Sequence, residues 1–253
     1  MVEALFWPAL LGYGEAALAY TSARTARTAT WGVRIGWLAQ TALLGAQAAH
    51  ADGFPWWSWA GSLNLFVWLV VGAYLIWGCR PRFRLLGLAV MPLAVALFAI
   101  ARIGGGTHAR GADGYGSLFL VLHVGGVLAA FAGFTLAAAL AALYLWQERK
   151  LERRSADILR LRVPPLASLE QLTRRTVVVS LPLLTVGLAA GLIRLRHDHR
   201  SLDALEAVTL VTWFVYGAFL LARPSGRRAA YLALGGFALV IAARLVLSAG
   251  HFA

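Results

Sequence analysis

The sequence predicts an all-α membrane protein: a polytopic bundle of eight transmembrane helices with both termini outside the cytoplasm. Three observations lead to this fold class. The 253 residues are 60% hydrophobic and only 13% charged, with a mean hydropathy of +0.71, whereas a soluble domain carries about 25% charged residues. Apolar stretches of spanning length recur along the chain, and basic residues collect in alternate loops. This composition excludes disorder, a disulfide scaffold and an ordinary cytosolic enzyme.

The predicted helices follow the apolar stretches in order, since a span needs about 20 apolar residues. The shortest stretch, the fourth, spans only if it is untilted, and the longest, the fifth, can tilt or project from the membrane. Eight spans use about 160 residues, so we predict a single transmembrane domain over 1–253 with no separate soluble domain. The stretches cover about 4–22, 31–51, 58–78, 85–101, 117–146, 176–195, 204–222 and 229–250.

The basic residues orient this bundle. Of the 23 Lys and Arg residues, 16 fall in one set of loops and five in the alternate set, and the more basic loops stay in the cytoplasm. Both termini are therefore expected outside and the 147–175 connection inside. The net charge of +12 then indicates contact of the cytoplasmic loops with anionic lipid, and no nucleic acid. The connection is either an amphipathic surface helix or a helix extension that ends at a Pro164-Pro165 turn.

All six histidines fall on the outer side in this orientation, and histidine is the commonest metal ligand. A zinc site is disfavoured because the single cysteine, Cys79, provides no thiolate pair. Haem needs two axial ligands on different helices, an apolar slot and basic partners for its propionates. His123 and His251 at helix ends, near Trp56 and Trp57, satisfy that pattern. The alternative is that these are interfacial residues without a ligand, the tryptophans forming an aromatic belt. The histidines are His50, His108, His123, His197, His199 and His251.

Charged residues also fall within predicted spans, where each needs a partner or a wet cavity. One interpretation is that Glu15 pairs with Arg34 or Arg244 as an interhelical clamp. The other is that Arg244 approaches a haem propionate beneath His251. Asp203, like Glu206, also fits the first turn of a helix, where a carboxylate complements the dipole.

Four segments of the chain, in order, resemble the cytochrome c assembly family, which includes the CcsA, HemX and YpjD groups. The segment beginning LFLVLHVGGVLAAF resembles the family's central helix, and SLEQLTRRTVVVSLPLLTVGLAAGLI resembles the next one. Residues 35–71 are similar to its early helices and 212–253 to its last two. The resemblance covers roughly 31–253. It implies an integral membrane haem-handling protein, with haem b as cofactor and no enzymatic activity.

The resemblance also implies site residues. His123 and His251 match the two outer haem-ligating histidines of CcsA-like members, and Asp203 matches an acidic position. The tryptophan-rich segment expected before the seventh helix is missing. Gln40 and Leu221 occupy the places of the two intramembrane histidines. These departures favour a divergent HemX- or YpjD-type member.

The implied function is cytochrome c biogenesis, through haem delivery or export, or else regulation of haem synthesis. The implied partners are haem and apocytochrome c or another assembly subunit, at the cell membrane. Two alternatives remain open: a small-solute transporter without haem, lined by the charges within the spans, and a bis-histidine electron carrier.

Overall fold

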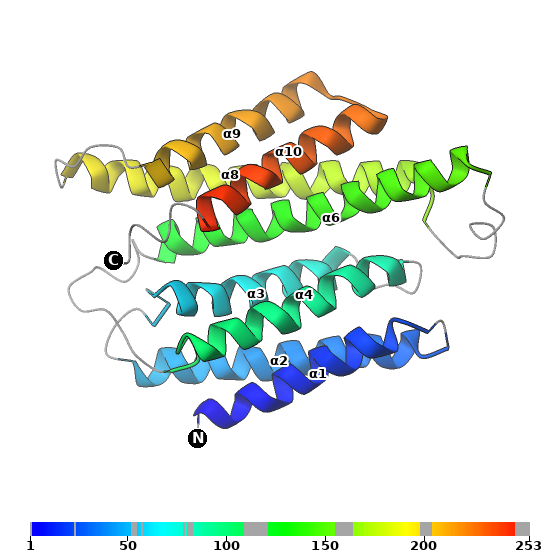
Figure 1. Ribbon diagram of the computed structural model, residues 1–253. Helices are drawn as coiled ribbons and strands as arrows, with labels where there is room; N and C mark the ends of the chain where they lie inside the picture. Colours follow the sequence, from blue (N-terminus) through cyan, green and yellow to red (C-terminus); the bar gives the residue numbers. More distant parts are fainter. Residues whose placement is uncertain are drawn as a thin grey trace. The chain divides into compact units, whose positions relative to one another are not determined.

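The computed structural model describes residues 2–22, 24–51, 55–56, 58–77, 79, 83–108, 121–154, 164–197 and 204–245. The chain divides into two compact units, Met1–Leu120 and Val121–Ala253, and each is described by itself. The described residues contain eight α-helices, one short 3-10 helix and one π-helical turn (Figure 1). The predicted all-α class is therefore confirmed.

The described part of the first unit contains four α-helices, with α1 packed on α2 and α4, and α3 packed on α2 and α4. Its core is aromatic, since the rings of Phe6 and Phe98 lie 4.9 Å apart and are both buried. Close approach of α1 to α2 depends on glycine, because a Cβ added at Gly12 would lie 2.8 Å from the Gly36 backbone. The elements are η1 (Val2–Leu5), α1 (Phe6–Ala19), α2 (Ala26–His50), α3 (Trp59–Trp77) and α4 (Arg84–Ile103).

The second unit is built around α6, whose alanine- and glycine-rich sequence lets α8 and α10 pack closely on it. Helix α9 completes the unit against α8 and α10. The chain runs up and down, so one end of the unit gathers η3, the end of α8, the start of α9 and the end of α10 (Figure 1). The elements are η3 (Val121–Gly125), α6 (Gly126–Glu152), α8 (Leu166–His197), α9 (Ala204–Ala222) and α10 (Gly226–Leu245).

The helix boundaries differ from the predicted stretches where a helix continues beyond its apolar part. Helix α8 begins at Leu166, directly after Pro165, about ten residues before the predicted stretch. Helix α6 continues to Glu152. Both ends of the 147–175 connection are therefore extensions of the neighbouring helices α6 and α8. Residues 155–163 lie outside the described part. Hydropathy detects only the apolar portion of such helices, because the charged turns beyond it are helical but not hydrophobic.

Among the described residues, four helices are long and apolar enough to cross a membrane. The remaining four differ from them in length or composition. Helix α1 has 14 residues, and the apolar described part of α9 is Glu206–Ala222. The candidate spans are Trp59–Ile76, Arg84–Ile103, Val121–Glu152 and Leu166–Ile193.

Candidate functional site

His123 lies in the π-helical turn η3, at the N-terminal entrance to α6. Its Nδ1 is 2.8 Å from the backbone carbonyl oxygen of Gly187 on α8. A carbonyl oxygen only accepts, so Nδ1 carries a proton and donates it, and in the neutral ring Nε2 then has the lone pair. A backbone carbonyl in this position fixes the tautomer and orientation of metal-binding histidines. Single π turns inside helices are frequent at functional sites because they reposition one side chain.

Two glycines on α8 make room for this turn. A Cβ added at Gly191 would lie 2.6 Å from Cε1 and 2.8 Å from Nδ1 of His123. A Cβ at Gly187 would lie 2.8 Å from the backbone nitrogen of Val127. These distances are shorter than real Cβ contacts. The imidazole therefore occupies a notch in α8 that is open because residues 187 and 191 are glycines. The Gly187–Gly191 spacing is the small-xxx-small pattern of closely packed membrane helices.

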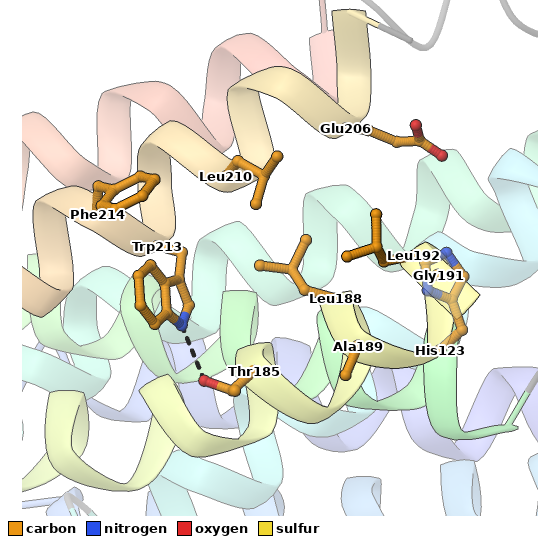
Figure 2. Close-up of a pocket in the computed structure, with 10 residues that line it drawn as sticks. All are labelled: His123, Thr185, Leu188, Ala189, Gly191, Leu192, Glu206, Leu210, Trp213 and Phe214. Atoms are coloured by element: carbon orange, nitrogen blue, oxygen red, sulfur yellow. Dashed lines mark hydrogen bonds between the residues drawn. The ribbon is translucent and has the colours of Figure 1, made fainter. Parts of the chain in front are cut away.

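The His123 ring lines a pocket of about 290 Å³ between α8 and α9. Leu188 and Leu192 of α8 form much of its wall (Figure 2). Figure 2 shows His123 and Glu206 toward one end of the pocket and Trp213 toward the other. The lining is mainly apolar, with few polar side chains, as in sites for small organic molecules.

The polar groups at the far end of the pocket are satisfied within the protein. Trp213 donates its Nε1 hydrogen to Thr185 Oγ1 at 2.8 Å, and the Thr185 hydroxyl donates to the Leu181 carbonyl oxygen at 2.9 Å. Glu206 lies in the first turn of α9, where the helix dipole favours its charge. The pocket therefore offers a ligand an aromatic and aliphatic wall and one ring nitrogen that can bind a metal, His123 Nε2.

This arrangement suits a flat, largely apolar molecule with a metal that takes an axial nitrogen, and it does not suit an all-protein metal site. Within the described ranges, no group of three or more His, Cys, Asp or Glu side chains is placed to hold a metal ion. A single histidine in an apolar pocket is the pattern of proximal haem ligation.

The other predicted site residues are placed less fully. Trp56 lies in the turn before α3, in the first unit, with its Cα against Gly61. Arg244 is on α10, and its side chain lies outside the described part. Trp57, Asp203 and His251 also fall outside the described residues. Of the predicted set, His123 alone is therefore seen to line a pocket within what the structure describes.

Sequence reasoning missed the apolar walls of this site and also Gly187, Gly191, Thr185 and Trp213. The four-residue glycine spacing was the available signal for the two glycines. Trp213 and Thr185 gave none, because a single tryptophan or threonine inside an apolar helix does not by itself indicate a site.

A buried amide network occupies the core of the first unit. Tyr13 donates its hydroxyl hydrogen to Gln40 Oε1 at 2.6 Å, and Gln40 Nε2 donates to Asn64 Oδ1 at 2.9 Å. Asn64 Nδ2 donates to Gln47 Oε1 at 3.1 Å, and Gln47 Nε2 to the carbonyl oxygens of Gly106 and His108 at 3.0 and 2.9 Å. All three amide side chains are fully buried. Their donors and acceptors serve one another, which favours a structural role over a solute path.

The positions that replace the family's intramembrane histidines have distinct surroundings. Gln40 is held by the amide network, whereas Leu221, near the end of α9, is 87% exposed. The predicted clamp between Glu15 and Arg34 is wrong: within the described residues these two side chains form no ion pair, and the Arg34 guanidinium lies over the Trp31 ring at 5.1 Å. The other predicted partner of Glu15, Arg244, has its side chain outside the described part.

Comparison with known proteins gives one consistent result. A sequence profile described as "Cytochrome C assembly protein" matches residues 56–250. A cytochrome c biogenesis protein CcsA from Gloeothece citriformis is 27% identical in an alignment of 266 positions, gaps included, that covers 83% of this chain and 81% of the relative. The CcsA of a Picosynechococcus species is 27% identical over 301 residues, covering 93% and 89%. That of Guillardia theta is 26% identical over 226 residues, covering 79% and 75%. No solved structure gives a significant match.

Proposed function

The chain belongs to the cytochrome c assembly protein family, as its sequence predicted, and on this premise we propose that it binds haem through His123. The proposed site is the pocket between α8 and α9 that His123 lines, called the outer pocket below because His123 falls on the predicted outer side. It is a multi-pass membrane protein of the cytochrome c biogenesis family. The proposed activity is haem handling without catalysis: the protein holds haem at the outer face and passes it to a partner.

The observation that carries this proposal is the hydrogen bond from His123 Nδ1 to Gly187, made at the edge of an apolar pocket. It leaves Nε2 as the free nitrogen donor, and a neutral imidazole is the form that binds haem iron. Leu188 and Leu192 would contact one face of the macrocycle. The pocket volume is at the lower end for ligand sites, so the described walls would grip part of the ring and leave an edge accessible for transfer.

The remaining predicted residues keep their roles as parts of this proposal. His251 would hold the haem iron together with His123, and Arg244, on α10, would neutralise a propionate. Trp56 and Trp57 belong to the first unit and stay predicted aromatic residues of the outer side, and Asp203 would take the family's acidic position. When bound, haem supplies a redox-active iron whose state depends on both axial nitrogens.

We also propose eight spans with both termini outside. Helices α1, α2, α9 and α10 each pack along one of the four candidate spans, which supports a shared depth. A reporter fused after Ala253 is expected to be active outside the cytoplasm, and one inserted near Ser155 to be active inside. Activity on the opposite sides would contradict this orientation and the placement of His123 at the outer face.

The partners follow from the proposed location. At the outer face of the cell membrane, apocytochrome c or another assembly subunit would receive the haem, and the cytoplasmic loops would contact anionic lipid. The alternative to haem delivery is regulation of haem synthesis, in which the same haem-binding chain would act through its cytoplasmic 147–175 connection.

A haem titration of the detergent-purified full chain tests the function. Addition of haemin should give a saturable 1:1 complex with the Soret and α bands of a six-coordinate, low-spin iron. His50→Ala is the matched control, because His50 also directs Nδ1 to a backbone carbonyl, that of Ala46 at 2.8 Å, but is exposed and lines no described pocket. Absence of saturable binding would contradict the proposal and favour a solute transporter.

A further inference from the structure

A second hollow lies at the opposite end of α6 from His123. It has a volume of about 460 Å³ and lies between the last turns of α6 and the facing side of α10. Arg149 follows His123 by 26 residues, which corresponds to about 39 Å along a helix at 1.5 Å per residue. A bilayer with its headgroups is about 40–45 Å thick. With His123 at the outer face, this hollow lies at the level of the inner headgroups.

The rim of the hollow is cationic. Arg149, Lys150 and Arg153 line it together with Trp146. The three basic residues follow Trp146 by three, four and seven positions, so all four side chains share one face of α6. The helix dipole favours cations in a last turn, but it does not explain why an open hollow with two aromatic side chains in its lining lies beside them.

The neighbouring carboxylates of α6 are used elsewhere. Arg227 of α10 donates its Nε hydrogen to Glu148 Oε2 at 2.8 Å and also pairs with Glu152. No carboxylate lines the hollow among the residues that the structure describes. The three rim cations therefore face a space that contains no described counter-ion.

The interior of the hollow is apolar. Ala142 and Leu145 of α6 and Leu234 of α10 line it, and Tyr231 stands opposite Trp146. Ala142 is seven residues before Arg149, about 10 Å deeper along the helix. Charge at the surface and apolar contacts one or two turns deeper match a molecule with an anionic head and a hydrocarbon tail.

We propose that this basic pocket, defined by Trp146, Arg149, Lys150, Arg153 and the apolar residues beneath them, binds one anionic phospholipid. The arginines hold the phosphate, to which a guanidinium can donate two parallel hydrogen bonds, and an acyl chain lies along the apolar floor. Basic pockets between membrane helices on the cytoplasmic side bind anionic headgroups in this way. The inference rests on the proposed orientation of the chain and is independent of haem binding.

Lipid retention by the purified full chain tests the proposal. Native mass spectrometry in micelles that contain phosphatidylglycerol or phosphatidylcholine with identical acyl chains should show one tightly retained phosphatidylglycerol. Each basic contact at a membrane surface contributes roughly fivefold in affinity. The triple variant Arg149→Gln, Lys150→Gln, Arg153→Gln should therefore lose about 100-fold. The charge-retaining Arg149→Lys, Lys150→Arg, Arg153→Lys should lose roughly tenfold or less, because it keeps the charges but exchanges the guanidinium groups.

The matched control removes the same charge from the same side of the membrane, outside the pocket: Arg174→Gln, Arg175→Gln, Arg228→Gln. It should retain phosphatidylglycerol like the wild type. Equal loss in the control, equal retention of phosphatidylcholine, or wild-type retention by the pocket variant would each overturn the proposal. Displacement of the lipid by millimolar glycerol 3-phosphate would also overturn it, since the acyl chain would then contribute nothing.

Two further measurements separate this site from haem binding and from misfolding. Phosphatidylglycerol with brominated acyl chains should quench Trp146 fluorescence, and Trp146→Phe should remove that part of the quenching. All variants should still bind haemin at the outer pocket. If the triple pocket variant instead loses haemin while Trp146 quenching persists, the rim cations belong to the haem path and the lipid assignment is wrong.

Discussion

Replacing His123 by Ala is expected to weaken haemin binding by at least about 100-fold, or ~2.7 kcal/mol. The proposed site takes its axial nitrogen from this side chain, and groups that merely orient a ligating histidine already change affinity by 10–100-fold. The residual complex should be five-coordinate or absent in the optical spectrum. The protein should stay folded, because His123 is only partly buried at the start of its helix.

Gly191→Ala tests the same contact without removing the histidine. Its new methyl group would lie within 2.8 Å of His123 Nδ1, so the ring must turn away and its hydrogen bond to Gly187 must lengthen. We expect roughly tenfold weaker haemin binding, in the range found for residues that orient a ligand. Gly217→Ala on α9 is the matched control, because nothing lies within 4 Å of a Cβ added there. Wild-type binding by both His123→Ala and Gly191→Ala would place the haem site elsewhere.

Replacing Asn64 by Leu is expected to lower the free energy of unfolding by about 1–3 kcal/mol. Asn64 accepts from Gln40 and donates to Gln47 and to the Gly106 carbonyl oxygen. Its removal takes away the hydrogen bond to buried Gln47 Oε1, whereas Gln40 Nε2 keeps the Asn64 backbone carbonyl and the Gly106 carbonyl keeps Gln47 Nε2. One unsatisfied buried group costs about 1–3 kcal/mol, while hydrogen bonds between membrane helices average only ~0.6 kcal/mol. Unfolding in mixed micelles with increasing SDS measures the change.

The control for Asn64→Leu is Thr173→Val in the second unit. Thr173 is also buried, but its hydroxyl bonds only the Leu169 carbonyl oxygen of its own helix, at 2.9 Å, so the loss should stay below about 1 kcal/mol. Folded Asn64→Leu should bind haemin normally, because the amide network and His123 belong to different units. A stability change no larger than that of the control would mean that the network contributes little.

The helices were predictable because each contains an apolar stretch. Their charged ends were not: residues 166–175 belong to α8 but carry too many polar side chains for a hydropathy signal. The π turn at Val121–Gly125 was also beyond sequence reasoning, because it depends on the space left by Gly187 and Gly191, of which Gly187 lies 64 positions after His123.

The candidate site was predictable in its ligand and not in its walls. His123 stood out as a histidine at a helix start that matched a family position. Thr185 and Trp213 meet only when α8 and α9 pack side by side. The amides of Gln40 and Asn64 were likewise isolated polar residues in apolar helices, and their pairing depends on relative depth, which the sequence does not specify.

Chemical rescue of His123→Gly tests most directly the central claim that the His123 nitrogen ligates haem iron in the outer pocket. The purified full-length variant would be titrated with haemin and then with imidazole, and its absorbance and electron paramagnetic resonance spectra recorded. The account predicts weak binding without imidazole and saturable return of the wild-type low-spin spectrum with it, since the cavity left by the side chain admits the free ligand. A His123→Gly protein that shows the wild-type spectrum without imidazole would contradict the claim.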